Sequence, residues 1–411
     1  MSFRTGGPAL RFALVSALAS VAAFSGALQV GCASSADAPV PVAEGSDAIV
    51  TLPASPVKNQ SNGNCWAYAI AGWSESLHKA KTGANINLSE SYWTYWRWFS
   101  QITSRPDSNS LDSGAGVDDA FTLVRKYGYM SEATFIPEEI DDATSTRQRD
   151  AEVALKASLQ DGALSTVAAR KNPSIVRAEL EKAWKLAPVV ADQLTSVFGA
   201  NYQWTFDNWG MKTEGTFVHR SSDLPVAWRE YSRKTMRADT LESVLSRWTR
   251  NVYPTETGKR RAFQKRIQRA LHDKNPVLID WYVSWKQYDK QFTFEGVPGE
   301  KVVMPPGHVS YFADYEVDNV PGFGTLQAGT DETRAAALSG ALADGAKVKF
   351  FRIKNSWGTD GNGAAPGFYD LHLSYLDGPI TGCNEKEDKS FDDTKCTDVV
   401  PLQGVYLPYG Y

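Results

Sequence analysis

The chain has 411 residues, of which 22% are charged and 42% are hydrophobic, and its formal net charge is −4. This length allows two or three domain-sized cores, and the composition is that of an ordinary globular protein. A mildly acidic chain of mixed charge gives no reason to expect a nucleic acid as a partner.

The N-terminal segment, residues 1–31, has the pattern of a signal peptide. Arg4 and Arg11 precede an apolar run rich in Ala, Ser and Gly that ends just before Cys32, as in an exported protein. Three outcomes remain open: cleavage with lipidation of Cys32, cleavage without lipid, and retention of the run as a membrane anchor. Residues 32–50 are small and include proline, and we expect them to form a flexible tether.

Residues 51–137 are expected to form a helical lobe. Apolar residues recur at a spacing of 3–4 after Cys65, which predicts a helix to about Lys79. Residues 87–90 have the chemistry of an N-terminal cap for a second helix. The aromatic residues of that helix are Tyr92, Trp93, Tyr95, Trp96, Trp98 and Phe99. They could stack on sugars or peptides, or they could form the core and a subsite wall of the lobe.

Residues 138–275 are expected to form a largely helical insertion. Asn172 and Pro173 are a good helix start, and residues 239–242 resemble a capping box. A basic stripe follows at helical spacing, and its members are Arg260, Arg261, Lys265, Arg266 and Arg269. This stripe either binds an acidic partner or forms a solvated face.

Residues 276–411 are expected to form a lobe of antiparallel strands, so the predicted fold class is α+β. The strands are expected at 277–282, 308–315, 348–354 and 367–373. We expect residues 318–345 to form a loop near the cleft between the lobes, where they could determine specificity. The apolar and aromatic tail, residues 405–411, could close one end of the cleft or dock as a final strand.

Cys383 and Cys396 flank an acidic, polar loop. In an exported protein such a pair most simply forms a disulfide, and a metal site is the alternative. That loop contains no histidine, so we expect no metal there.

Four side chains occur in an order that can form a nucleophilic site: Gln60, Cys65, His308 and Asn355. A thiolate can attack a carbonyl, an imidazole can protonate the leaving amine, and the two amides can hold the oxyanion and orient the imidazole. Cys65 begins the predicted first helix, where the helix dipole favours a thiolate.

The segments KNQSNGNCWAYA, GHVSYFADYE and FFRIKNSWGTDGNG resemble the papain-like cysteine peptidases over roughly residues 53–137 and 276–376. The resemblance implies a papain-like two-lobe fold, with a helical lobe carrying the cysteine helix and an antiparallel, β-barrel-like lobe carrying the histidine and the asparagine. It also implies a peptide or protein substrate and no cofactor. The residues with implied catalytic roles are Gln60 for the oxyanion, Cys65 as nucleophile, His308 as acid and base, and Asn355 as its orienter. The residues implied to line the substrate site are Gly63, Asn64, Trp66, Gly114, Ala115, Gly307 and Trp357, the last also shielding the His308–Asn355 hydrogen bond.

The sequence also departs from that family. Five positions separate Gln60 from Cys65, where six are usual, and the loop lacks the cysteine that often forms a disulfide there. Gly114-Ala115 stands in place of a Gly-Gly pair that binds the substrate backbone. The wide spacing between Cys65 and His308 is similar to that of the bleomycin hydrolase or aminopeptidase C branch.

Residues 28–32, Leu-Gln-Val-Gly-Cys, resemble the lipobox of bacterial lipoproteins, with Gln29 where an aliphatic residue is usual. This resemblance implies a lipid on Cys32 and a place in the cell envelope, at the outer membrane; secretion follows if no lipid is attached. Two functions from different classes are therefore considered: an active cysteine peptidase, and a catalytically weakened papain-like lipoprotein that binds a partner at the surface.

Overall fold

The computed structural model describes residue 52 and residues 56–140, 142–199, 215–231, 236–289, 292–297, 299–304, 306–330, 332–358, 366–386 and 390–411. The expected signal peptide, the tether and Cys32 lie outside the described residues. In the described part of the chain, no helix is long and apolar enough to cross a membrane.

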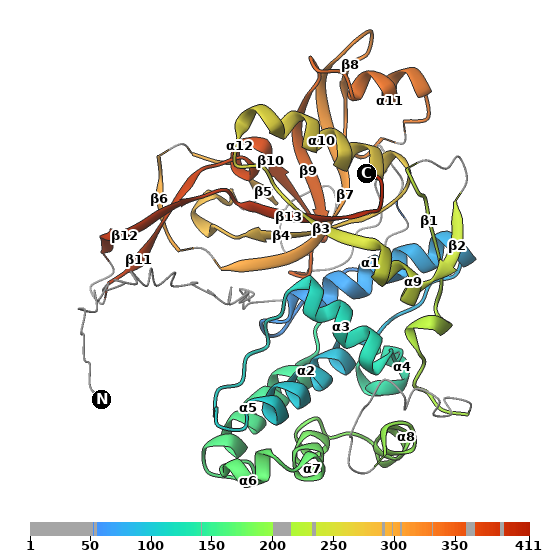
Figure 1. The fold of residues 1–411 in the computed structure, drawn as a ribbon, viewed down its shortest axis with the longest axis vertical. Coiled ribbons are helices and arrows are strands. Elements are labelled where there is room, and N and C mark those ends of the chain that lie inside the picture. Colours follow the sequence, from blue (N-terminus) through green and yellow to red (C-terminus); the bar gives the residue numbers. More distant parts are fainter. Residues whose placement is uncertain are drawn as a thin grey trace, which may run out of the picture.

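The fold is α+β, as the sequence predicts, and its helices and its main sheet form two lobes (Figure 1). The helical lobe contains α1 (Cys65–Thr82), α2 (Glu90–Ser104), α3 (Val117–Tyr127), α4 (Glu132–Phe135), η1 (Pro137–Glu139), α5 (Thr146–Gln160), α6 (Val167–Arg170), α7 (Pro173–Ala183) and α8 (Pro188–Phe198). In Figure 1 this lobe fills the lower half of the molecule, and α1 lies between it and the sheet.

The main sheet has the strand order β3-β13-β4-β7-β9-β10-β5, with β8 paired to β7. Its strands are β3 (Trp248–Val252), β4 (Val277–Tyr282), β5 (Thr293–Phe294), β7 (Gly307–Val320), β8 (Gly324–Leu326), β9 (Lys347–Lys354), β10 (Phe368–His372) and β13 (Leu402–Pro408). All these neighbours are antiparallel except β10 and β5. The helices of this lobe are α10 (Thr257–His272), η4 (Trp285–Gln287), α11 (Ala335–Ala341) and α12 (Leu373–Leu376).

Helix α1 is buried on all sides from Cys65 to Leu77, because the helical lobe covers one side of it and the sheet covers the other. Its C-terminal end is capped by Gly83 at φ 73°, whose N–H donates to the Lys79 carbonyl. That left-handed conformation favours glycine. A small unit packs on this end of α1, where His78 Nδ1 lies 2.8 Å from the Pro225 carbonyl oxygen. Its elements are η3 (Ser221–Asp223), β1 (Pro225–Trp228), β2 (Arg237–Thr240) and α9 (Leu241–Arg247).

The aromatic residues of α2 form the core of the helical lobe. The helix begins at the predicted cap, where Ser89 Oγ accepts a hydrogen bond from the Tyr92 N–H at 3.1 Å. Trp96 and Trp98 are completely buried, and Trp96 stacks on Tyr127 with ring centroids 4.1 Å apart. A role in binding sugars through these rings is therefore excluded, and the core interpretation is correct.

The range 138–275 of the expected insertion contains helices α5 to α10 and is divided between the lobes. Helices α5 to α8, the last of which ends at Phe198, belong to the helical lobe. β3 pairs with β13 at one edge of the main sheet, and α10 contacts β4, β7 and β13. Residues 248–272 therefore belong structurally to the sheet lobe.

The basic stripe on α10 makes contacts within the chain and does not point only into solvent. Arg260 is buried and donates to the carbonyl oxygens of Pro254, Thr255 and Asp377. Three other members reach carbonyls or a carboxylate: Arg261 reaches Ala341 and Ala343, Lys265 reaches Asp344, and Arg266 reaches Tyr411. Arg269 lies over the Tyr231 ring. These contacts fix α10 to the rest of the sheet lobe.

Two segments that could have reached the cleft lie elsewhere. The C-terminal tail docks as strand β13 between β3 and β4, and Tyr411 contacts Asp273 and Arg229. The segment 318–345 contains β8 and α11 and leaves the far end of β7. Twelve residues of strand separate that end from His308, roughly 40 Å at 3.3 Å per residue, so the expectation of a specificity loop near the cleft is wrong.

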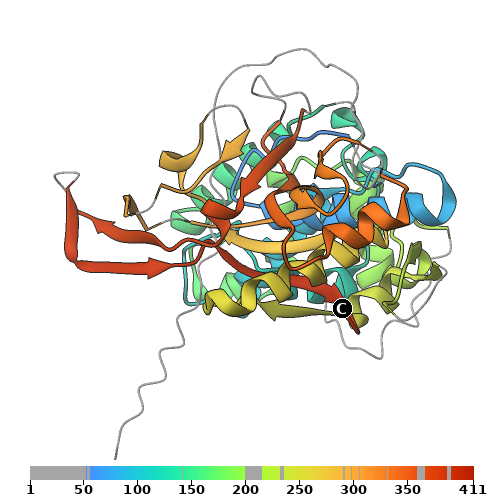
Figure 2. The same ribbon diagram turned by 90° about the horizontal axis from the view of Figure 1, so that it is seen from above.

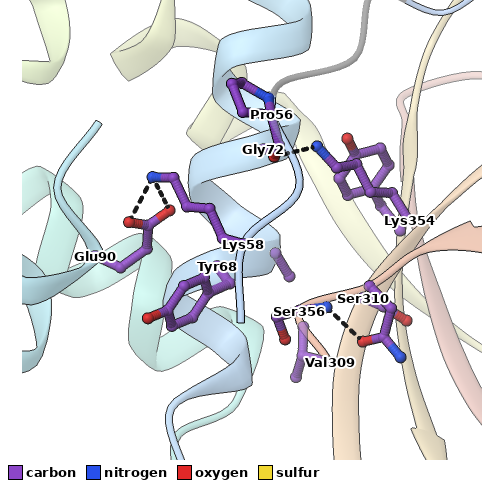
Figure 3. Close-up of a pocket in the computed structure, with 12 residues that line it drawn as sticks. Pro56, Lys58, Tyr68, Gly72, Glu90, Val309, Ser310, Lys354 and Ser356 are labelled. Carbon is purple, nitrogen blue, oxygen red and sulfur yellow. Dashed lines mark hydrogen bonds and ion pairs between the residues drawn. The ribbon is translucent and has the colours of Figure 1, made fainter. Parts of the chain in front are cut away.

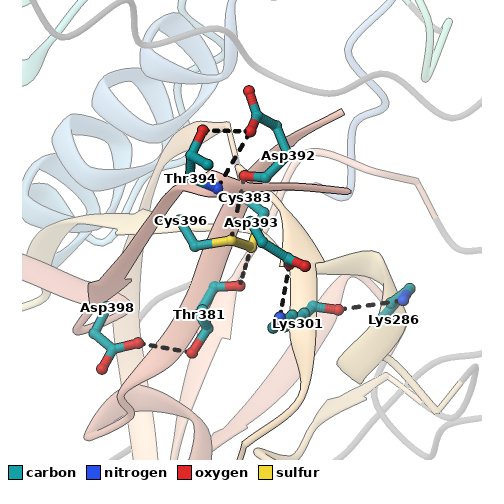
Figure 4. Close-up of a disulfide and its surroundings, with 9 residues drawn as sticks. All are labelled: Lys286, Lys301, Thr381, Cys383, Asp392, Asp393, Thr394, Cys396 and Asp398. Atoms are coloured by element: carbon teal, nitrogen blue, oxygen red, sulfur yellow. Dashed lines mark hydrogen bonds and ion pairs between the residues drawn. A yellow bond between two sulfur atoms is a disulfide. The ribbon is translucent and has the colours of Figure 1, made fainter. Parts of the chain in front are cut away.

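A separate three-stranded arm extends from the sheet lobe, with the order β12-β11-β6 (Figure 2). Its strands are β6 (Lys301–Val303), β11 (Ile380–Glu385) and β12 (Phe391–Val399). Cys383 and Cys396 are directly opposite in β11 and β12 and form a disulfide (Figure 4). Exposed charged residues on the edge strand β12, such as Asp393 and Lys395, disfavour pairing with another chain.

We predict that the double change Cys383→Ser/Cys396→Ser loosens the arm and leaves the main sheet intact. The cross-link closes a short loop, and loss of such a link costs roughly 3 kcal/mol by the chain-entropy estimate. Hydrogen exchange should become faster at the β11 and β12 amides, whereas protection of β4, β7 and β9 should not change. Equal loss of protection in the main sheet would contradict this prediction.

Candidate active site

Cys65 is the first residue of α1, and the loop before it ends at Asn64 in the N-cap position. No side chain caps this helix end, and its first turn has no acidic residue. The dipole of this helix favours negative charge on the sulfur. The Val309 N–H on β7 points at Cys65 Sγ from 3.4 Å.

His308 and Asn355 come together from β7 and from the residue after β9. His308 Nε2 lies 2.7 Å from Asn355 Oδ1, and the Ser356 N–H donates to the same oxygen at 2.9 Å. Because Oδ1 is the acceptor of both bonds, His308 must carry its hydrogen on Nε2. Nδ1 is buried and has no hydrogen-bond partner among the described residues. In the neutral imidazole this nitrogen is the one that can take a proton.

Two tryptophans enclose the His308 ring. The centroid of Trp357 is 4.6 Å from that of His308, and the Trp281 ring meets it edge-on at 5.5 Å. Trp281 lies opposite His308 in the β4–β7 register, and its Nε1 donates to Ser310 Oγ. Trp281 lies in no recognisable motif, and its place in a predicted strand before the histidine strand is the only signal for it in the sequence. These rings exclude water from the His308–Asn355 bond.

Gln60 is attached to the segment that carries Asn355. The Gln60 N–H donates to the Ser356 carbonyl at 2.8 Å, and Ser356 Oγ donates to Gln60 Oε1 at 2.6 Å. Gln60 Nε2 also donates to the Asn62 carbonyl at 3.0 Å. An amide nitrogen carries two N–H donors, so this contact is compatible with a second donation to an oxyanion.

The residues expected to line the substrate site have different environments. Gly63 and Gly307 are half-buried at the boundary between the lobes. Trp66 is completely buried and donates to the Ser113 carbonyl at 2.8 Å, next to Gly114 and Ala115, which are also buried. Asn64 points into the helical lobe and donates to Thr94 and Gln148, so its side chain supports the loop and does not face a substrate.

The site is closed in this structure, because Cys65 and His308 are both 0% exposed. Among the described residues no cysteine is a free thiol, and Cys65 is disulfide-bonded. The nucleophilic chemistry considered below is therefore that of the reduced thiol, and a substrate must gain access to it.

A buried ionic cluster lies behind the site, around a cavity of ≈ 20 Å³ that has space for about one water (Figure 3). Lys58 donates to Glu90 at 2.7 Å, and Lys354 donates to the Pro56 carbonyl at 2.8 Å. Burial lowers the pKa of Lys354 to about 7 and raises the pKa of Glu132 to about 8. The cluster holds the strand that leads to Gln60 against both lobes. Within the described residues no group of His, Cys, Asp and Glu could hold a metal ion.

No protein-family model matches the chain. Three solved structures overlap it at low similarity. PepW from Lactobacillus rhamnosis HN001 is 12% identical, with a TM-score of 0.42 over 89% of this chain and 82% of PepW. The bromelain protease from Ananas comosus in complex with the E64 inhibitor is 15% identical, with a TM-score of 0.34 over 86% and 93% of the two chains. Xylellain, a cysteine protease from Xylella fastidiosa, is 12% identical, with a TM-score of 0.36 over 91% and 96%. Similarity at this level carries no argument about activity, so the proposal below depends on the site itself.

The ionisation of His308 provides a prediction. Burial lowers the pKa of His308 to about 4, whereas a thiolate beside Nδ1 would favour the imidazolium. In a Cys65→Ser variant, where no thiolate can form, His308 should titrate near 4. In the reduced parent it should titrate at a higher pH. Imidazole NMR shifts against pH would measure both, and equal pKa values in the two proteins would contradict a thiolate–imidazolium pair.

The lowered pKa of His308 also predicts how the stability of the Cys65→Ser variant depends on pH. The unfolded chain takes up a proton near pH 6.5 and the folded one only near 4, so stability should be lost as the pH falls from 6.5 to 4. The loss attributable to His308 should be on the order of 3 kcal/mol. Adding His308→Gln should remove this part of the pH dependence in urea unfolding.

Proposed function

We propose that this protein is a cysteine peptidase that hydrolyses peptide bonds through an acyl-enzyme on Cys65. One observation carries the proposal. His308 is bound through Nε2 to Asn355 and keeps Nδ1 without a hydrogen-bond partner in the described part of the chain. The adjacent Val309 N–H contacts the sulfur at the start of α1. The imidazole is therefore oriented by Asn355, and the residue after His308 contacts the sulfur that it would activate.

The reaction follows from these positions. His308 Nδ1 takes the thiol proton, and the thiolate forms a bond to the carbonyl carbon of the substrate. The negative charge moves to the carbonyl oxygen, where Gln60 Nε2 and the first-turn N–H of Cys65 can donate to it. His308 then gives its proton to the leaving amine as the C–N bond breaks. In the second half, His308 takes a proton from water, the hydroxide attacks the thioester, and the thiolate leaves.

The alternative function, a weakened papain-like module that binds a surface partner, has one observation in its favour. Cys65 and His308 are fully covered here, and the nucleophile is not a free thiol. The buried polar groups around them favour the peptidase. His308, Asn355 and Gln60 are all buried and are held by hydrogen bonds in this segment. Burial of such polar groups costs stability, and it is more typical of an active site than of a binding surface.

The first prediction of this proposal concerns the catalytic residues. Cys65→Ala should reduce hydrolysis of fluorogenic peptides in reducing buffer by at least about 10³-fold. Asn355→Ala should reduce it less, because Asn355 only orients His308. A thiol-directed epoxide inhibitor should block the parent. Substantial activity in Cys65→Ala with an unchanged melting curve would exclude the proposal, and an inactive parent under reducing conditions would favour the binding module.

The position of the C-terminus bears on the cleavage mode. Tyr411 lies near Arg229 and the far end of α1, away from Cys65, so the described tail does not close the cleft. A peptide-library cleavage profile would measure the cleavage mode together with the side-chain preference.

For localisation we propose a lipid-anchored protein of the cell envelope, with Cys32 as the lipidated residue. Because Cys383 pairs with Cys396, Cys65 is then a reduced thiol. The support is the sequence alone: Arg4 and Arg11, an apolar run, and Cys32 followed by small polar residues. When the parent is expressed in a bacterial host it should partition with membranes, resist salt extraction and begin at a blocked residue 32. Cys32→Ser should move to the soluble fraction, whereas the neighbouring Ser35→Ala should not. If Cys32→Ser fractionates like the parent, lipidation is not the anchor.

A further inference from the structure

The loop between Gln60 and Cys65 places both the oxyanion donor and the nucleophile, yet it is short and contains no cysteine for a cross-link. Inside the loop, the Asn64 N–H donates to the Asn62 carbonyl at 2.8 Å. Both asparagine side chains are buried, so they need partners from outside the loop. Those partners come in large part from the helical insertion.

Gln148, the third residue of α5, contacts the loop at two points. Its side-chain oxygen accepts a hydrogen bond from Asn64 Nδ2 at 2.7 Å, and its backbone oxygen lies 3.5 Å from Asn62 Nδ2. Its side-chain nitrogen donates to Ser91 Oγ on α2 at 2.8 Å. Tyr68 on α1 also points its hydroxyl at the same Gln148 oxygen, at 3.5 Å. Gln148 is 1% exposed and therefore links α1, α2, α5 and the catalytic loop.

The start of α5 is itself firmly held. Ser145 caps the helix by accepting from the Gln148 N–H, and Glu139 accepts from Ser145 Oγ at 2.5 Å and from the Arg147 N–H at 2.9 Å. Just before the helix, the Ala143 carbonyl accepts from the Asn59 N–H at 2.7 Å. The insertion is thus hydrogen-bonded to both ends of the loop.

We propose that Gln148 is a positioning residue for the nucleophile. It fixes Asn64, the residue that precedes Cys65, and so restrains a loop that contains no cysteine for a covalent cross-link. The inference rests on the proposed function, and it adds that α5 to α8 determine the geometry of the reaction although they carry no reacting group.

The test compares three variants. Gln148→Met keeps the approximate volume and removes the hydrogen bonds, so kcat should fall about 10–100-fold while KM changes little, because a small misplacement of a reacting group is costly. Gln148→Glu keeps an oxygen for Asn64 and Tyr68 and should recover part of kcat. Leu155→Val is the matched control: it weakens packing of the same helix at a buried position, and should lower Tm without changing kcat.

A double change separates positioning from general stability. If Gln148 acts through Asn64, then Gln148→Met/Asn64→Ala should lose no more kcat than the larger single loss. Independent, additive losses would overturn the proposal. So would a Gln148→Met enzyme with parental kcat, or an equal fall of kcat in Leu155→Val.

A second readout needs no substrate. In the reduced protein, the rate of Cys65 alkylation by iodoacetamide, measured against pH, reports formation of the thiolate. In Gln148→Met the inflection of this rate should move to a higher pH. If the parent hydrolyses no peptide, the proposed function fails, while this measurement still tests the positioning. An unchanged alkylation profile would overturn the role of Gln148 whether or not the parent is a peptidase.

Discussion

The contact between α1 and β7 is the constraint on which the site depends, because the proposed nucleophile and the proposed base belong to different lobes. Cys65 begins α1, and His308 is the second residue of β7. Trp73, two turns along α1, donates to the Pro276 carbonyl at 3.2 Å and meets Trp248 edge-on at 5.0 Å. A close-packed interface does not deform continuously. Packing far from the sulfur therefore fixes where the sulfur lies relative to the imidazole.

Some polar groups at this boundary pair with partners from distant parts of the chain. Ser356 and Gln60 are 296 residues apart, and Lys58 reaches Glu90 on α2. Removal of one partner from such a pair leaves the other desolvated and unpaired, at a cost of several kcal/mol for a charged group. A wrong register of the two lobes would break these pairs together. They therefore contribute to specifying one arrangement more than to net stability.

Local signals in the sequence predicted much of the fold. The caps at Ser89 and Asn172 begin helices as expected, and the strands around His308 and Asn355 are present. Caps and alternating patterns depend on residues that are neighbours in the chain, so they can be recognised in a single sequence. The boundary of the insertion was not predictable, because β3 is short and mostly exposed. Its pairing with β13, about 150 residues later, leaves no local pattern.

The candidate catalytic residues were recognisable because their motifs are local, and the residues that support them were not. Gln148 lies 83 positions after Cys65 in a helix with no motif, and only the packing of α5 against α2 brings it to the loop. Trp281 faces His308 through a strand register that sequence spacing does not specify. Such support depends on tertiary contacts.

Helices α5 to α8 pack into the core of the helical lobe. Trp184, at the end of α7, packs against Tyr95 and Trp98 of α2, and all three are completely buried. Without α5 to α8, the aromatic face of α2 would be open to water, an exposure that a soluble lobe does not tolerate. The same helices bring Gln148 to the loop before Cys65. The packing that covers the core of the lobe therefore also brings the Gln148 side chain to the loop that precedes Cys65.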